Sequence, residues 1–496
     1  MIKIGGVQKR GPSHTPSARV KMANIFGPGT SRGIITMMAS RVFNRAFHSL
    51  LVLGVFSLLG AMPSQAAEPL KVGLFAVDAS PPVGSPLAYD PNKEVLLPLS
   101  CKGLVLVGDG TPIVLCAVDW IGIGNDGQVA FRQALAKAAG TSVERVNVHT
   151  LHQHDAPHCD FSANRLLAEY GINHELLDNR FARDVMARAA DAVYTAVKDA
   201  KPVTHVGIGQ AEVEKVASNR RIPGPDGKIE FVRYTACADP IIRDKPVGTI
   251  DPQLKLISLW DSETPIVAIT YYATHPQSYY RTGLANPDFP GIARDAREKE
   301  TGVPHIHFDG AGGNIGAGKW NDGSHENRQI LADRVADGMK RAWEATQKTP
   351  ISAADLGWKS VPVALPVGKH LNEEKLLAEL ENPAATPLQR GRAANDLIWL
   401  RRCNAGGTID ISCLKLGQTR VLHMPGELFV EYQLAAQAMR PDLFVAMAAY
   451  GDYAPGYIGT TVSYAEGGYE TGPTASLVDP SVEPLLMDVI KKLLSD

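Results

Sequence analysis

The chain carries, at residues 143–158, the sequence Val143-Glu144-Arg145-Val146-Asn147-Val148-His149-Thr150-Leu151-His152-Gln153-His154-Asp155-Ala156-Pro157-His158. Its first half alternates apolar and polar residues, as a β-strand with one buried face does. In a strand, residues two apart point to the same side, so a continued strand would present His152 and His154 to one cavity. Neutral imidazole is a preferred zinc ligand, and hydrolytic zinc sites keep one position open for water. The segment therefore predicts a strand that ends in a candidate metal site, with a histidine-rich polar loop as the alternative.

Composition sets the class of protein. The chain has 496 residues, of which 45% are hydrophobic, enough for one large or two ordinary domains with a core. Its 50 basic and 52 acidic residues leave a net charge of −2, and no long run of Lys or Arg occurs. Nucleic acid is therefore excluded as an expected partner. The sequence has no repeat at solenoid or propeller period.

The N-terminal part of the chain is interpreted as a targeting segment. An apolar run over residues 50–62 follows a basic stretch and precedes Ser64-Gln65-Ala66, a small-x-small cleavage signal. This pattern predicts a signal peptide over residues 1–66, and the run is short for a membrane span. We expect export to the periplasm or the extracellular space. Because the basic stretch is over-long, the N-terminus is interpreted as mis-assigned, with translation starting at Met37 or Met38.

Export implies an oxidising compartment in which disulfides form. Cys101 and Cys116 flank a predicted hairpin whose turn carries Asp109-Gly110, and Cys403 and Cys413 flank a turn-like stretch. Both pairs are candidate disulfides, and the connectivity of the six cysteines stays open. No C-x-x-C occurs, which argues against a cysteine-based zinc module or a thioredoxin motif.

Strand and helix patterns alternate along the mature chain, residues 67–496. Strands are predicted at 104–107, 113–118, 254–260, 265–273, 303–308, 419–424 and 443–449. Helices are predicted at 129–139, 181–197, 325–346, 372–402 (interrupted near Pro383 and Pro387) and 482–494. The mixture favours an α/β or mixed α+β fold, and no linker divides it, so we expect a single large domain. The charged, helix-rich segment 370–402 is interpreted as an insertion or lid.

Four further segments carry chemistry. His275 follows an apolar strand, where it could face an active-site rim or bond the backbone. The glycine-rich loop 308–318 fits neither a dinucleotide fingerprint nor a P-loop, but its N–H groups could serve an oxyanion. Glu427, in Pro425-Gly426-Glu427, could cap a helix or bind a metal. Tyrosines gather at 450–469, a pattern that packing or a cavity lining would explain.

Taken in order, these segments resemble the neutral (non-lysosomal) ceramidase family, from about Val72 to the C-terminus. The family's T-H-T-H-S-G-P is similar to residues 151–157, and its N-R-S-P to residues 219–222. Its H-P-x-S is similar to residues 275–278, and its P-G-E is intact at 425–427. Two family tyrosines twelve positions apart match Tyr457 and Tyr469, with Tyr453 as the second choice for the first of them.

The resemblance implies a large mixed α/β catalytic domain and a zinc site. The implied zinc ligands are His152, His275, Glu427 and Tyr457. The implied catalytic residues are His154, Arg220 and Tyr469. His149 and His158 are left without a role.

Two departures from the family pattern stand out. The family's nucleophilic serine lies in S-N-x-G-D, and we place Gly310 at the serine position. Glycine has no nucleophilic group, so Asp309 beside it is assigned the orientation of a water. The chain ends at Asp496, so we expect no C-terminal immunoglobulin-like domain of the kind that the family carries.

These observations predict a secreted, zinc-dependent hydrolase that cleaves an N-acyl amide or an ester by metal-activated water. The resemblance implies a lipid or other small-molecule substrate, sphingolipid metabolism and transient contact with a membrane surface. Two alternatives stay open. One is a zinc esterase or deacylase for polar or sugar substrates, and the other is a ceramidase-like binding protein that has lost its chemistry.

Overall fold

The computed structural model describes residues 69–172 and 177–495, so the predicted signal peptide lies outside the described residues. The described residues belong to one compact unit. Among them, no helix is both long enough and apolar enough to cross a membrane. The fold is mixed α/β, as the sequence predicts.

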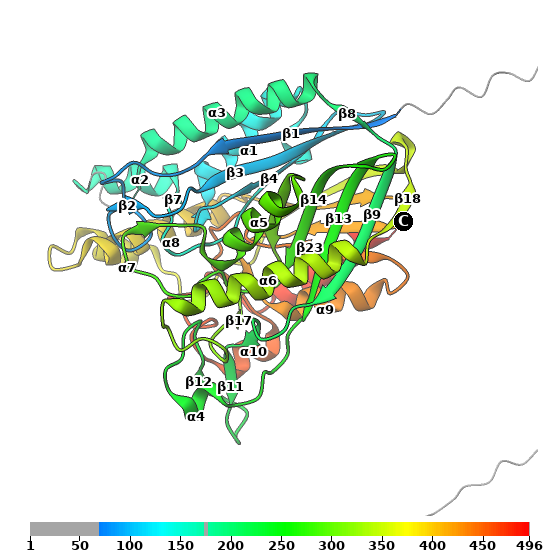
Figure 1. Ribbon diagram of the computed structural model, residues 1–496. Helices are drawn as coiled ribbons and strands as arrows, with labels where there is room; N and C mark the ends of the chain where they lie inside the picture. The colour runs from blue at the N-terminus through cyan, green and yellow to red at the C-terminus, as the bar shows by residue number, and fades with distance from the viewer. Residues whose placement is uncertain (1–68, 173–176, 496) are drawn as a thin grey trace, which may run out of the picture. The chain divides into compact units, whose positions relative to one another are not determined.

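Three mixed β-sheets form the frame of this unit (Figure 1). Sheet 1 has the order β6-β4-β3-β1-β8 and contains β1 (Leu70–Asp78), β3 (Ser100–Val107), β4 (Ile113–Val118), β6 (Val146–Thr150) and β8 (Lys201–Val203). Sheet 2 has the order β16-β14-β13-β9-β18 and contains β9 (His205–Glu212), β13 (Gln253–Asp261), β14 (Thr264–Tyr272), β16 (His305–Asp309) and β18 (Gln347–Pro350). Sheet 3 has the order β19-β20-β21-β23 and contains β19 (Leu356–Val363), β20 (Ile409–Leu416), β21 (Thr419–His423) and β23 (Phe444–Ala448).

Helices cover the outer face of each sheet. Figure 1 shows α3 running along sheet 1 and α6 along sheet 2. The covering helices are α1 (Asn125–Ala139) and α3 (Asn179–Lys198) on sheet 1, α5 (Asp288–Thr301) and α6 (Glu326–Glu344) on sheet 2, and α9 (Val430–Met439) and α11 (Val482–Leu494) on sheet 3. A separate cluster joins α2 (Phe161–Glu169), α7 (Glu373–Glu381) and α8 (Pro387–Asn404).

Short elements complete the described part of the chain. The short helices are α4 (Pro240–Arg243) and α10 (Thr461–Glu466), with 3-10 turns at Val143–Arg145 and Ala353–Asp355. The short strands are β2 (Glu94–Val95), β5 (Gly122–Ile123), β7 (His158–Cys159), β10 (Ser218–Asn219), β11 (Arg221–Pro223), β12 (Ile229–Val232), β15 (Leu284–Ala285), β17 (Ile315–Gly316), β22 (Glu427–Leu428) and β24 (Tyr457–Ile458).

The three sheets share one chain path. Each contains two antiparallel strands, then a helix, then a strand parallel to the second: β3-β4-α1-β6, β13-β14-α5-β16 and β20-β21-α9-β23. A further helix then packs on the same sheet: α3, α6 or α11. Loops that follow parallel strands leave from one edge of a sheet, where side chains can meet over a common site. This repeat of topology, which the sequence does not reveal, creates three such edges.

The edges of the three sheets from which these loops leave lie next to one another, and backbone hydrogen bonds join them. The amide of Thr150, at the end of β6, donates to the carbonyl of Tyr450, just after β23, at 3.0 Å. The amide of Ala449 donates to the carbonyl of Asp309, at the end of β16, at 2.9 Å. Between the sheets, the inner faces form one apolar core, and alternate residues of β4 illustrate it: Leu115 faces this core and Cys116 faces the helices.

The predicted segment 372–402 is two helices, α7 and α8, with a break that includes Pro383. Pro387 does not break a helix but opens α8, because the missing N–H of a first-turn proline costs no hydrogen bond. Thr386 and Gln389 cap this helix reciprocally. The other predicted helices and strands match observed elements within a few residues.

All six cysteines are free thiols. Cys101 and Cys116 do face each other across β3 and β4, with their Sγ atoms 3.4 Å apart. Neither candidate pair forms a disulfide in the structure.

Candidate metal centre

The first strand of the candidate site ends earlier than the alternation predicts. β6 stops at Thr150, and His152 has a φ of +57°, which breaks the strand geometry. The expectation that His152 and His154 lie on one face of a continued strand is therefore wrong. Their rings still converge, with centroids 4.8 Å apart, because the turn at His152 brings them together. A non-glycine residue in this conformation costs roughly 1–3 kcal/mol, and such strain gathers at functional sites.

Three buried histidines form a cluster that could hold a metal ion. His152, His154 and His275 each offer a ring nitrogen, and these nitrogens lie within 4.8 Å of one another. His275 comes three residues after β14, so two different sheets supply the imidazoles. Burial lowers the pKa of His154 and of His275 well below the ordinary value, and the neighbouring His152 ring lowers both further. Both rings are therefore neutral near pH 7, as metal ligands must be.

A carboxylate from the third sheet completes the cluster. Glu427 follows β21, and its Oε2 lies 3.2 Å from His152 Nε2 and 3.9 Å from His275 Nε2. The Tyr453 hydroxyl donates to the other oxygen, Oε1, at 3.1 Å. The backbone of Glu427 is held by pairing of β22 with β24.

The tautomer of His152 tests whether these atoms suit a cation. Its Nδ1 lies 2.7 Å from the carbonyl oxygen of Ile121, which only accepts, so Nδ1 carries the hydrogen. Nε2, the other ring nitrogen, faces Glu427 Oε2, which is buried and has no hydrogen-bond partner among the described residues; without a proton on Nε2, two lone pairs would meet there. Two buried lone pairs facing each other require a cation or an added proton between them. The donor set of imidazoles and a carboxylate fits a divalent metal ion such as zinc.

Tyr457 lies beside the cluster with its ring stacked on His275, at a centroid distance of 6.4 Å. Arg220 donates from Nη1 to the Tyr457 hydroxyl at 3.2 Å. Glu470 is fully buried and pairs with Arg220 and with Arg221, each at 3.2 Å. Burial raises the pKa of Tyr457 well above its ordinary value. Tyr457 therefore keeps its proton. Because the hydroxyl oxygen accepts a hydrogen bond from Arg220, the hydroxyl proton can be donated to another acceptor.

The remaining predicted residues fall outside the cluster. Tyr469 is 41% exposed and meets the edge of the Tyr457 ring. Asp309 is fully buried, 3.3 Å from His307, and is not among the cavity-lining residues. Burial raises the pKa of Asp309 well above its ordinary range, so it is a neutral core acid in this environment. The orientation of a water by Asp309 stays a prediction.

His149 and His158, left without a role by the sequence, have separate environments. His149 donates from Nδ1 to the carbonyl of Ala449 and meets His423 at 3.0 Å, in a buried pair away from the cluster. His158 packs against Tyr453. Tyr450 was not singled out, yet its ring stacks on His152 at 4.8 Å and its φ is +59°. The sequence feature that could have indicated a site role for Tyr450 is its position directly after a buried strand.

The glycine-rich loop leaves no room for a nucleophilic side chain. A Cβ on Gly310 would lie 2.5 Å from Gln433 Oε1, which is not part of the cluster. Gly313 lies three residues further along the same loop. There a Cβ would lie 2.2 Å from the carbonyl oxygen of Glu427. The loop is therefore built to let the backbone of Glu427 approach closely.

Substituting Gly313 by alanine is expected to destabilise the fold by about 1–3 kcal/mol, the usual cost of overpacking. The added methyl must push on the Glu427 backbone and so should also weaken metal binding. Chemical denaturation and metal analysis measure both effects. Gly110→Ala is the matched control, because its nearest neighbour would be 3.9 Å away. Wild-type stability and metal content in Gly313→Ala would contradict this geometry.

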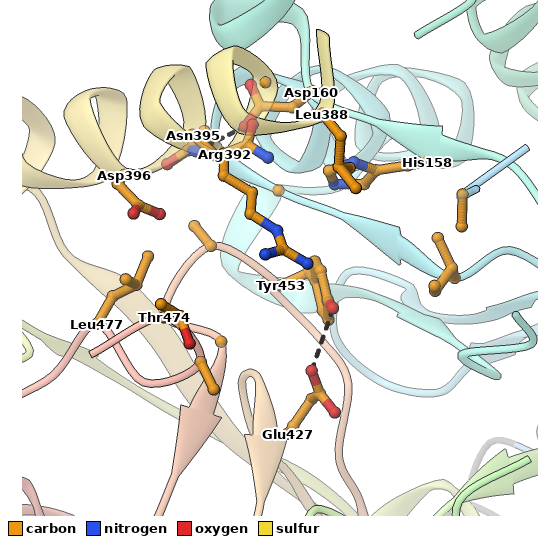
Figure 2. A pocket seen from close by; sticks show the side chains of 18 of the residues that line it. His158, Asp160, Leu388, Arg392, Asn395, Asp396, Glu427, Tyr453, Thr474 and Leu477 are labelled. Atoms are coloured by element: carbon orange, nitrogen blue, oxygen red, sulfur yellow. Dashed lines mark hydrogen bonds between the residues drawn. The ribbon is translucent and has the colours of Figure 1, made fainter. Parts of the chain in front are cut away.

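A cavity of about 220 Å³ opens beside Glu427. Its wall includes Tyr453, Tyr457 and Tyr469 together with residues of α8. Figure 2 shows Tyr453 and Glu427 facing the residues of this helix. Residues of α8 therefore line the cavity beside the candidate site, with Arg392 extending into the space. Tyr89 links cavity and cluster, since it lines the cavity and stacks on His154 at 5.9 Å.

Comparisons with known proteins agree on the fold alone. No protein-family model and no curated protein sequence matches the chain. Among solved structures, the chain is similar to the neutral ceramidase from Pseudomonas aeruginosa, with a TM-score of 0.63 and 16% identity over 86% of this chain and 74% of that one. It is equally similar to a ceramidase complexed with C2, with a TM-score of 0.63, 16% identity, and 86% and 75% coverage. The chain therefore has the fold of a neutral ceramidase.

Proposed function

We propose that this protein is an exported, zinc-dependent hydrolase that cleaves an N-acyl amide or an ester bond. The observation that carries the proposal is the buried contact of 3.2 Å between His152 Nε2 and Glu427 Oε2 beside the imidazoles of His154 and His275. The fold shared with neutral ceramidases supports amide hydrolysis as the reaction. Export rests on the signal peptide predicted over residues 1–66.

The residues proposed to hold the metal are His152, His275 and Glu427. Tyr457 is the fourth ligand implied by the sequence, and His154 competes for that place because its nitrogen belongs to the cluster. Mixed nitrogen and oxygen ligation in a buried site suits zinc among the common divalent ions. When bound, zinc would polarise a carbonyl oxygen and lower the pKa of a water molecule towards about 7.

The chain's own side chains would then orient and transfer protons. His154 donates from Nδ1 to the carbonyl of His152 at 3.1 Å, so its Nε2 is unprotonated and can accept a proton from water. Tyr457, fixed by Arg220, can donate to the oxygen of the carbonyl as negative charge develops on it. Arg220 acts through Tyr457, because Glu470 and Gly313 hold the guanidinium in place. The loop 310–313 offers no serine, so the proposal uses direct attack by water.

Removal of the metal is the primary test. The purified mature protein should contain stoichiometric zinc, hydrolyse short N-acyl amides or esters, lose this activity on chelation and dialysis, and regain it with added zinc. Metal analysis and a substrate panel of N-acyl-sphingosine, short acyl esters, acetylated sugars and N-acyl amino acids measure these properties. Full activity after complete chelation would end the proposal. Stoichiometric zinc without hydrolysis of any panel member would favour the binding-protein alternative.

A further inference from the structure

The cavity beside Glu427 has a wall that the metal centre does not explain. Helix α8 contributes Leu388, Arg392, Asn395 and Asp396 to it. Figure 2 shows Arg392 reaching from α8 across the cavity towards Tyr453, whose hydroxyl holds Glu427. The side chain therefore points at the edge of the candidate metal centre.

The guanidinium of Arg392 interacts electrostatically with Asp396 and with Tyr469, which also line the cavity. It is exposed to the cavity and makes no hydrogen bond or ion pair of normal length with any residue that the structure describes. Most arginines near the site are engaged, as Arg220 and Arg221 are with Glu470. Among the described residues that line the cavity, Arg392 is the lone lysine or arginine. It thus supplies one positive charge with a free planar fork, which suits a carboxylate.

The acids nearby leave that charge largely uncompensated. Asp160 is engaged at the N-terminus of α2, where it accepts from Ser162 and Ala163, and it also accepts from Asn125 at 2.7 Å. Burial raises the pKa of Asp396 to about 7, so this acid is only partly ionised near neutral pH. Burial lowers the pKa of His158 to about 4, which leaves its ring neutral. A monoanion beside Arg392 would meet a positive charge that Asp396 compensates only in part.

Part of the remaining wall is apolar, and this part is short. Leu167, Leu177, Leu388 and Leu477 line it. Pockets for drug-sized ligands are about 300–1,000 Å³, so a cavity of about 220 Å³ suits a small molecule with a short acyl group better than two long lipid chains. A dianionic phosphate would call for more cations than this wall provides.

Resting on the proposed hydrolase function, we infer that the substrate is an N-acyl amino acid whose carboxylate pairs with Arg392. The scissile amide lies beside Glu427 and Tyr457, and the short acyl group packs on the leucines. Water gives its hydroxyl to the acyl carbon and its proton to the departing nitrogen. The C–N bond breaks, a C–O bond forms, and the products are a carboxylic acid and a free amino acid, with no change in oxidation state. Arg392 is a specificity-determining residue in this scheme.

The test compares matched probes on the zinc-loaded protein. N-hexanoylglycine should exceed its neutral twin N-hexanoylglycinamide in kcat/KM by roughly 10- to 100-fold, the value of one charge-assisted contact. Arg392→Gln should erase this preference. Arg401→Gln is the matched control on the same helix, because Arg401 pairs with Glu373 at the surface, and it should keep the preference. N-hexanoyl-aminomethylphosphonate and N-hexanoyl-sphingosine should be poorer substrates than N-hexanoylglycine.

Equal rates for the two glycine probes, a preference that survives in Arg392→Gln, or faster cleavage of the phosphonate or the sphingosine probe would overturn the inference. If neither these probes nor any member of the wider substrate panel is cleaved, the proposed function fails, and calorimetric titration of N-hexanoylglycine into chelated protein then decides the inference separately. Binding that weakens in Arg392→Gln supports a site where Arg392 pairs with the carboxylate of the ligand. Absence of binding to the wild type contradicts such a site.

Discussion

Replacing His275 by alanine is expected to remove stoichiometric metal and to lower kcat/KM for any cleaved substrate by roughly 10³-fold or more. His275 supplies a neutral nitrogen to a buried cluster in which Glu427 Oε2 already faces His152 and has no hydrogen-bond partner among the described residues. A catalytic metal stabilises transition-state charge by several kcal/mol, and each 1.4 kcal/mol is about tenfold in rate. The loss should therefore appear first in metal content and then in rate.

The matched control is His370→Ala, an exposed histidine outside the cluster, which should keep both metal and activity. Metal analysis after gel filtration and steady-state kinetics are the measurements. Far-ultraviolet circular dichroism excludes misfolding as the cause of any loss. The same metal analysis on His154→Ala and Tyr457→Phe decides the fourth ligand, because loss of metal should follow the true ligand. Retention of tightly bound zinc by His275→Ala would contradict the proposed centre.

The local fold could be predicted because its signals are local. Apolar residues spaced four apart predict α3, and the terminal helix 482–494 coincides with α11. The three-sheet arrangement could not be predicted, because the pairing of β4 with β6 or β14 with β16 joins strands separated by a helix. No period in the sequence marks the shared chain path of the three sheets, since the repeat lies in the order of the elements rather than in the residues.

The candidate site, like the fold, could be predicted from the sequence only in part. His152, His275 and Glu427 lie far apart in the chain, and their assignment came from a resemblance of ordered motifs rather than from spacing. The structure brings these three together. The sequence did not single out Arg392, because a charged residue in a helical segment is normally expected on the solvent-exposed surface. Its position in the cavity wall follows from where α8 packs, which the sequence does not show. His154 was given a pocket role, whereas its nitrogen lies in the cluster itself.

Arg294→Met is expected to lower the free energy of unfolding by about 3–5 kcal/mol at pH 7, the usual cost of leaving one member of a buried ion pair behind. Arg294 on α5 donates to both oxygens of Asp119, at 2.7 and 3.0 Å, and both side chains are almost fully buried. Asp119 follows β4, so this pair joins sheet 1 to the helix that covers sheet 2. Asp119 also accepts from Gln153, the residue between His152 and His154, at 3.1 Å. The substitution should therefore loosen the metal centre as well as the fold.

The pH dependence distinguishes an unpaired carboxylate from a simple loss of packing. Burial alone would raise the pKa of Asp119, but Arg294 reverses this, and the pKa lies below its ordinary value. In the wild type, ionised Asp119 contributes to the free energy of unfolding at pH values above its pKa in the unfolded chain, about 4. This contribution is lost as the pH falls through the lower pKa that Asp119 has in the folded protein. Without Arg294 the folded pKa rises above the unfolded value, so the penalty grows as pH rises. The gap in unfolding free energy between wild type and Arg294→Met should accordingly widen from pH 5 to pH 8. A difference that stays constant with pH would assign the effect to packing. The control is Arg165→Met, which removes an exposed ion pair with Asp126 and should lower the free energy of unfolding by no more than about 1 kcal/mol at either pH.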